Sequence, residues 1–463
     1  MMPIGTPFLR LKLRFREKTE RCWFPSSFHL TVAGWSLQIS LLIMQIPPAF
    51  AGQDIENPES EDPDPCRSVA ILDAGHEGLE SNPSAEPCSP PDGTAPDDAR
   101  REIVSEIAEG THTSESLESL LLGRDYVFFG RVEVDAAAYS GDIPSSENGA
   151  QLRRLRVGMA GLTTFFDALS YKIELDLTDG TNNFSDVYLQ WDTPRGGLFR
   201  LGNQRISQNL SAMTSSLSQL FMEDPLPVSA FSLKRRLALS YDQNWRRFGL
   251  HGMVFSRDPN NNAGEYGWAL RAFSEPIRGP RKLGHFGVFF VTEKMDDEAR
   301  YRTRPESRVT GTRLVDTGLY SDVRYQHVAG IELAGGVGAN SARFEWFRSR
   351  WDRAGGRKNN FEGAYLELGH FLTGQAFNYR GGKFVRPMIE SGERAWEVGL
   401  RASWVNLTDR DVQGGEQVNL GAALNYYFLP GLRFQLNLLH FRTDGAAGKD
   451  AGWIMQGRIQ YNR

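Results

Sequence analysis

The chain has 463 residues, of which 24% are charged and 11% are aromatic, and its formal net charge is −5. This mildly acidic balance does not favour a nucleic-acid partner. The three cysteines and eight histidines show no metal-ligand spacing, so the sequence predicts neither a metal centre nor a bound cofactor.

The first 51 residues have the order of a secretory signal peptide. A basic region from Arg10 to Arg21 precedes an apolar run from Phe28 to Met44, and Ala49-Phe50-Ala51 follows as a cleavage site. The alternative is a membrane anchor, but the apolar run is short and contains several polar residues. We therefore expect export, with cleavage near Ala51.

Residues 52–124 form an acidic, proline-rich segment with 18 acidic and 4 basic residues. Such a composition buries too little apolar surface to offset the entropy of ordering, so we expect most of it to be a disordered periplasmic tail. A short amphipathic helix is predicted over 97–122, with acidic residues in its first turn. Cys66 and Cys88 would meet in an oxidising compartment, where either a disulfide or two free thiols fits the sequence.

From residue 125 to 463 the chain is a succession of strand patterns. The clearest is Val418, Leu420, Ala422, Leu424, Tyr426 and Phe428, which alternate with polar or small residues. A tilted strand needs about 9–11 residues to cross a bilayer, and this run is long enough. About sixteen strands are expected, and the 300–326 region is left open between strand and loop. They are centred on residues 126–136, 152–160, 171–177, 186–191, 198–205, 234–241, 247–256, 265–273, 284–293, 328–337, 342–350, 361–371, 395–405, 416–428, 432–439 and 452–462.

Alternation alone fits two all-β folds. A soluble sandwich turns its apolar face to the interior, whereas a membrane barrel turns that face to lipid and its polar face to the lumen. Export, strand length and the aromatic residues at the strand ends, such as Trp396 and Trp404, favour the barrel. The predicted fold is a transmembrane antiparallel up-and-down β-barrel with a short N-terminal extension.

Several short motifs in this region resemble the phosphate-selective porin O and P family. They are Arg302-Thr303-Arg304-Pro305-Glu306, Asp316-Thr317-Gly318, Phe344-Glu345-Trp346, Phe371-Leu372-Thr373-Gly374-Gln375, Tyr379, Phe384, Ala395-Trp396-Glu397, Arg401 with Ser403, Gly414-Gly415 and Leu424-Asn425-Tyr426-Tyr427. The resemblance implies a sixteen-stranded, trimeric porin in the outer membrane of a Gram-negative bacterium, in contact with its lipid.

By position, residues 207–232 resemble the constriction loop that folds into the lumen of porins. In the phosphate-selective members this region and the nearby wall carry basic residues, but here the loop has no Lys or Arg before Lys234. Gln375 and Phe377 likewise stand where the family tends to show Glu and Arg. We therefore expect passive diffusion of small hydrophilic or anionic solutes, among which phosphate-type anions are one possible class.

The barrel region is more basic than the net charge suggests. Without residues 1–124, basic residues outnumber acidic ones by five. Guanidinium groups bind oxyanions in bidentate fashion, and rings of them bias a pore toward anions. The candidate lumen cations, all opposite the apolar face, are Arg131, Arg154, Arg156, Lys172, Arg200, Arg271, Arg343 and Arg401. The alternative is that they pair with Glu133, Glu174, Asp176, Asp186, Glu345 and Glu397, above all Arg401 with Glu397.

Two other functions fit the same barrel. A barrel-embedded hydrolase would need a nucleophile beside a histidine, and the scattered His251, His285, His327, His370 and His440 show no partner spacing. A structural or adhesive barrel with a blocked lumen is allowed by aromatic residues on the polar face, such as Phe273, Phe289 and Tyr427. The sequence favours a porin over an enzyme.

Overall fold

The computed structural model describes residues 27–32, 35–40, 126–143, 147–163, 169–178, 183–256, 266–279, 281–387, 389, 392–445 and 448–463. The acidic segment, the helix expected over 97–122, and Cys66 and Cys88 lie outside these residues. Within the expected signal peptide, β1 (Ser27–Val32) and β2 (Trp35–Ser40) pair antiparallel and belong to a unit of their own.

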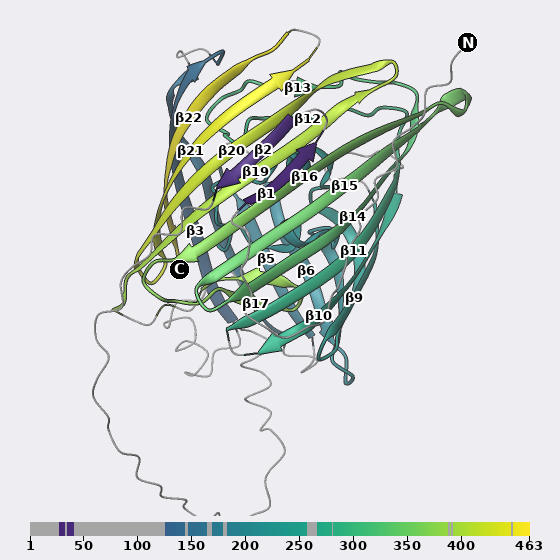
Figure 1. Ribbon diagram of the computed structural model, residues 1–463. Helices are drawn as coiled ribbons and strands as arrows, with labels where there is room; N and C mark the ends of the chain where they lie inside the picture. Colours follow the sequence, from purple (N-terminus) through teal and green to yellow (C-terminus); the bar gives the residue numbers. More distant parts are fainter. Residues whose placement is uncertain are drawn as a thin grey trace, which may run out of the picture. The chain divides into compact units, whose positions relative to one another are not determined.

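The main unit is a closed barrel of sixteen strands, each paired antiparallel with its neighbours (Figure 1). Closure comes from β22 pairing with β3, where Arg463 and Gly130 also exchange backbone hydrogen bonds. The strands are β3 (Tyr126–Gly141), β4 (Gly149–Leu162), β5 (Leu169–Asp176), β6 (Asn183–Asp192), β7 (Gly197–Gln204), β8 (Arg236–Asn244), β9 (Phe248–Ser256), β10 (Tyr266–Gly279), β11 (Lys282–Lys294), β14 (Val323–Val337), β15 (Asn340–Arg353), β16 (Lys358–Phe371), β19 (Ala395–Asp409), β20 (Val412–Leu429), β21 (Leu432–Asp444) and β22 (Ala451–Asn462).

The burial pattern confirms a barrel with an apolar outside and a polar inside. On β19 the outward Leu400 is 60% exposed, whereas the neighbouring inward Arg401 is 5% exposed. Aromatic side chains gather at strand ends on the outer face, where Trp396 stacks on Tyr426 with ring centroids 4.2 Å apart. This arrangement suits lipid contact outside and water or polar packing inside.

The two ends of the barrel differ in the lengths of their connections. At the end where β3 begins and β22 ends, which we call the terminal end, several turns are short, including 245–247, 338–339 and 430–431. In the last of these Gly431 has φ +86°, and an added Cβ would lie 2.2 Å from the Asn462 carbonyl oxygen, so glycine is required there. Short turns face the periplasm in outer-membrane barrels.

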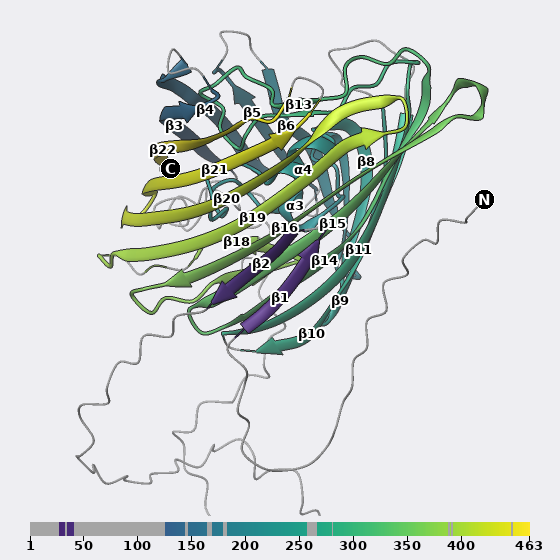
Figure 2. The same cartoon turned by 45° about the horizontal axis from the view of Figure 1, so that its top comes forward.

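Long connections lie at the other end, which we call the loop end. The inner loop (residues 205–235) carries two short helices, α3 (Leu210–Met213) and α4 (Leu226–Phe231), which lie within the ring of strands (Figure 2). The second loop (residues 295–322) is irregular apart from β12 (Arg302–Thr303) and β13 (Val315–Asp316). Of the region left open in the sequence, residues 300–322 are therefore mostly loop and residues 323–326 begin β14. No helix among the described residues is long and apolar enough to span a membrane.

One connection at the terminal end is also long. Its part over residues 372–387, which we call the terminal-end insert, contains the paired strands β17 (Asn378–Arg380) and β18 (Lys383–Val385). The insert packs Phe384 against Leu210 of the inner loop and Leu283 of β11. Segments from both ends therefore meet inside the barrel.

An apolar core forms where the inner loop and second loop pack on the inner wall. Phe231 of α4 meets Tyr301 of the second loop edge to face at 5.1 Å, and Tyr301 packs on Trp351 at 4.9 Å and Phe361 at 5.5 Å. All are buried. This aromatic packing holds two long loops against β15 and β16.

Candidate functional site: the lumen wall and the inner loop

All eight predicted lumen cations belong to strands of the closed barrel, and each has an acidic partner within 4 Å. On the first strands Arg154 pairs with Glu133, and Arg156 pairs with Asp176 at 2.7 Å. The remaining pairs are Arg131 with Glu133 (3.7 Å), Lys172 with Asp186 (3.4 Å), Arg200 with Asp242 (2.9 Å), Arg271 with Glu332 (2.8 Å), Arg343 with Glu367 (3.3 Å), and Arg401 with Glu367 (2.7 Å) and Glu306 (3.1 Å).

The alternative that Arg401 pairs with Glu397 is wrong, because Arg401 binds Glu367 and Glu306. Glu397 instead accepts hydrogen bonds from Asn425 (3.0 Å) and Tyr427 (2.8 Å). Glu345 also binds no predicted cation. It accepts hydrogen bonds from Asn209 (3.2 Å), the Ser211 backbone N–H (3.1 Å) and Tyr365 (2.6 Å), and so fixes the start of α3 to the wall.

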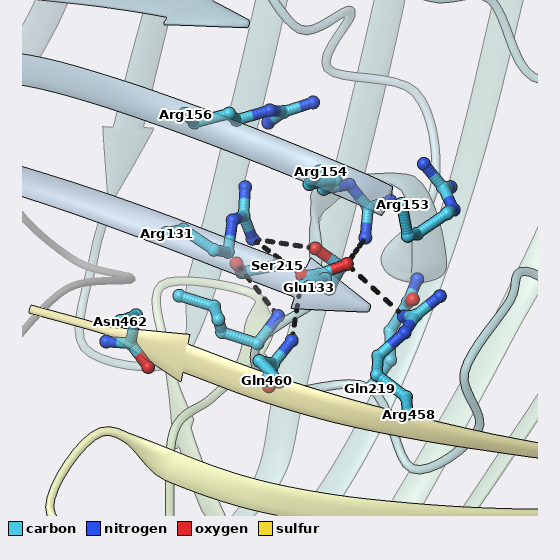
Figure 3. A network of polar contacts seen from close by, with 12 residues as sticks. Arg131, Glu133, Arg153, Arg154, Arg156, Ser215, Gln219, Arg458, Gln460 and Asn462 are labelled. Atoms are coloured by element: carbon cyan, nitrogen blue, oxygen red, sulfur yellow. Dashed lines mark hydrogen bonds and ion pairs between the residues drawn. The ribbon is translucent and has the colours of Figure 1, made fainter. Parts of the chain in front are cut away.

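Glu133 of β3 is the centre of a polar network at the seam of the barrel (Figure 3). Arg154 from β4 and Arg458 from β22 point toward it from the two neighbouring strands, and Gln460 donates a hydrogen bond at 2.8 Å. Arg131 also lies 3.7 Å from this carboxylate and donates to Ser216 of the inner loop at 2.9 Å. The network therefore connects β3 and β22, the strands that close the barrel, to the inner loop.

Hydrogen bonds from the far wall hold the inner loop along its length. Arg401 donates to the Glu223 carbonyl (2.8 Å), and Arg433 donates to the Gln219 carbonyl (3.1 Å). The Leu226 backbone N–H donates to Ser403 (2.9 Å). A loop whose backbone is bonded to β19 and β21 has a fixed place across the interior.

Charged groups on the two sides of the interior differ in their access to water. The side chains of Arg154, Arg156, Lys172 and Arg235 are between 12% and 21% exposed. Those of Arg271 and Arg401 are at most 3% exposed, because the terminal-end insert and the inner loop cover them. These four side chains of the basic side are therefore more accessible than those of Arg271 and Arg401.

Two further cations flank the inner loop and face that same side. Arg235 pairs with Asp186 at 2.5 Å, and Arg205 donates to the carbonyls of Ala212 (3.1 Å) and Thr214 (3.2 Å). Burial and the nearby Arg235 lower the pKa of Arg205, which lies outside the strands, to about 10. Arg205 therefore keeps its charge at neutral pH.

The terminal-end insert is held by a second buried network. Arg271 donates twice to Glu332, at 2.8 Å each, and once to the Gly382 carbonyl at 2.6 Å. The His285 ring lies 3.0 Å from Glu332 and 2.6 Å from the Tyr379 hydroxyl. Strands β10, β11 and β14 thus share one charge network with the insert.

Sequence reasoning missed several residues of these networks. Arg433 and Arg458 lie on the polar face of expected strands, and the alternation around them could have identified both. Glu306, the last residue of the Arg302–Glu306 motif, and Arg308 lie in the irregular second loop, where no alternation indicates which side chains face the lumen.

Comparison with known proteins gives a family match and several structural likenesses. The family described as "Phosphate-selective porin O and P" matches residues 128–462. A protein of Caulobacter vibrioides described as "Uncharacterized protein" is 30% identical over 341 residues, which cover 68% of each chain.

Solved outer-membrane proteins have similar folds at low identity. The trimer form of OmpT from Vibrio cholerae is 13% identical with a TM-score of 0.49, covering 73% of this chain and 99% of that one. An anion-selective porin from Comamonas acidovorans is 12% identical with a TM-score of 0.48, at the same coverages. The channel DcaP of Acinetobacter baumannii is 10% identical with a TM-score of 0.47, covering 73% and 97%.

The family match spans the whole barrel, and the barrel has the inverted polarity that a lipid environment demands. The chain belongs to the phosphate-selective porin O and P family of outer-membrane porins, which are channels and not enzymes.

Proposed function

We propose that this porin is a passive diffusion channel that prefers anions, and that its path runs along the first strands of the barrel. The supporting observation is a basic wall, formed by Arg131, Arg154, Arg156, Lys172, Arg205 and Arg235. Its acidic groups are four, namely Glu133, Glu174, Asp176 and Asp186.

The excess of cations on the wall is what favours anions. Ion pairing cancels most of the field of each matched charge, so the unmatched cations dominate at longer range. Arg205 has carbonyl partners rather than a carboxylate among the described residues. A guanidinium in this state keeps both its charge and free donors for a passing anion.

Selectivity for phosphate alone is a narrower proposal, and the sequence of the inner loop supports it less than it supports a general preference for anions. The family's description names phosphate, but the inner loop carries no Lys or Arg between residues 207 and 232. We therefore assign general anion preference, with the cations supplied by the wall and by the two ends of the inner loop. Constriction of the path by the inner loop is part of this proposal.

Reversal potentials in planar bilayers under a potassium chloride gradient test the ion preference. In the unaltered protein we expect a reversal potential whose sign indicates chloride preference. In Arg205→Gln we expect the reversal potential to shift toward potassium preference. The matched control is Arg348→Gln, because Arg348 is an outward arginine of β15. A potassium preference in the unaltered protein would refute the proposal, and absence of conductance would favour the structural or adhesive barrel.

We also propose a homotrimer, as the resemblance to the family implies. Light scattering of the detergent-solubilised protein, corrected for bound detergent, measures the mass of the assembly directly. We expect three copies, and a monomeric mass would overturn this assignment.

A further inference from the structure

Three arginines from three separate elements converge on one carboxylate of the inner loop. Glu223 accepts from Arg153 of β4 at 2.7 and 3.1 Å, from Arg458 of β22 at 2.7 Å, and from Arg308 of the second loop at 3.2 Å. Figure 3 shows Arg153 and Arg458 beside the Glu133 network, on β4 and β22, which flank β3. The contacts from Arg153 reach both carboxylate oxygens, which is the bidentate geometry that guanidinium groups favour.

The cluster holds more positive charge than the carboxylate neutralises. Arg458 also binds Asp135 at 2.7 and 2.8 Å, so it would keep an acidic partner without Glu223. For Arg153 and Arg308, Glu223 is the one acidic group within 4 Å among the described residues. Without it, two guanidinium groups would be left facing the same small volume.

The site also borders water. The Arg308 side chain is 42% exposed, and it belongs to a loop at the loop end of the barrel. Glu223 itself is 8% exposed, so its carboxylate is covered on the other sides. A small solute would approach from the side of Arg308.

We propose that Arg153, Arg308 and Arg458 form a binding site for small carboxylates, and that Glu223 occupies it as a tethered competitor. The carboxylate of Glu223 indicates the chemical class of the ligand, because the three arginines are already arranged around that planar group. A tethered group acts at a high effective concentration, so it weakens the apparent affinity for a free solute without abolishing exchange. This inference rests on the proposed diffusion path for its physiological role, but the site itself can be tested apart from conduction.

The direct test is chemical rescue with acetate. Glu223→Ala removes a CH₂–COO⁻ fragment, and acetate has the same carboxylate and one carbon. Thermal unfolding of the detergent-solubilised protein would be followed in acetate and in chloride at equal ionic strength. We expect acetate to raise the melting temperature of Glu223→Ala and to leave the unaltered protein unchanged at the same concentration.

Two further variants separate the site from a general salt effect. Asp224→Ala truncates the adjacent acid, which accepts from Gln219 (2.5 Å) rather than from arginine, and it should show no acetate response. Glu223→Ala combined with Arg153→Gln should lose at least tenfold in acetate affinity. Phosphate in place of acetate tests whether the site takes any oxyanion, and equal rescue by phosphate would overturn the assignment to carboxylates.

Conductance measurements distinguish a failure of this inference from a failure of the proposed function. If the unaltered protein conducts chloride but acetate binds equally to Glu223→Ala and Asp224→Ala, the carboxylate site is wrong and the channel stands. If acetate rescues Glu223→Ala in a protein that does not conduct, the site is correct and the diffusion path is wrong. Should Glu223→Ala fail to fold, Glu223→Gln, which keeps the side-chain shape, takes its place. The acetate concentration that gives half of the full effect is then measured for Glu223→Gln and for the unaltered protein. The proposal is refuted if Glu223→Gln does not respond at a lower acetate concentration.

Discussion

Replacing Arg271 by methionine tests whether the buried ion pairs of the interior are interdependent. Arg271 and Glu332 both have fully buried side chains, with two hydrogen bonds of 2.8 Å between them. Among the described residues, Arg271→Met would leave the buried Glu332 carboxylate with the His285 ring, at 3.0 Å, as its remaining partner. Removing one partner of a buried pair costs about 3–5 kcal/mol, because the remaining charge is not compensated.

The double variant supplies the decisive comparison. In Arg271→Met with Glu332→Gln no uncompensated charge remains, so we expect a smaller loss than in either single variant, with a coupling energy of about 2 kcal/mol or more. Urea unfolding in lipid vesicles, followed by tryptophan fluorescence and heat-modifiable gel mobility, measures these free energies.

The exposed pair Lys449–Asp444 at 3.1 Å, at the β21–β22 connection, is the control, and Lys449→Met should cost about 0–1 kcal/mol. The reasoning fails if Arg271→Met costs no more than this control, or if the double variant costs the sum of the single ones.

Three other changes probe separate parts of the molecule. Leu400→Arg puts a charge on the outward face of β19 and should cost about 2–4 kcal/mol if it lies near the bilayer midplane, which vesicle unfolding measures; a change within error would place this residue away from lipid. Phe231→Ala should lose about 3–5 kcal/mol because α4 packs this buried ring on Tyr301, and increased protease cleavage of the inner loop should accompany the loss. Hydrogen bonds from Arg353 and other groups lower the pKa of Asp411, in the β19–β20 turn, to about 2. Its stabilisation is therefore complete above pH 3.8 and is lost as the pH falls through 2, so the melting-temperature difference between the unaltered protein and Asp411→Asn should shrink over that range; a constant difference contradicts this assignment.

The interior shows why a porin of this kind needs long loops that return to the wall. Sixteen strands enclose more volume than their own side chains fill, and polar inner faces cannot collapse on one another as an apolar core does. The inner loop and the second loop supply apolar groups such as Phe231 and Tyr301, together with carbonyls that accept from Arg401 and Arg433. The inner loop is packed on the far wall in this way, while Arg154 and Arg156 of the basic wall stay partly exposed.

The amino-acid sequence by itself determined the barrel strands, their approximate bounds and the face on which their side chains lie. A period of two is a local property of the backbone, so Leu400 and Arg401 are assigned to opposite faces from their neighbours alone. The irregular stretch around Glu306 has no such period, and its contact with Arg401 was therefore not predictable.

Only the tertiary structure decided which charges meet. Arg401 lies opposite Glu367 because of the register between β16 and β19, and Arg458 lies opposite Asp135 because β22 closes on β3. Arg271 reaches Glu332 across an intervening strand. Register and closure depend on hydrogen bonds between segments far apart in the chain, so the alternation within one strand cannot specify its partners.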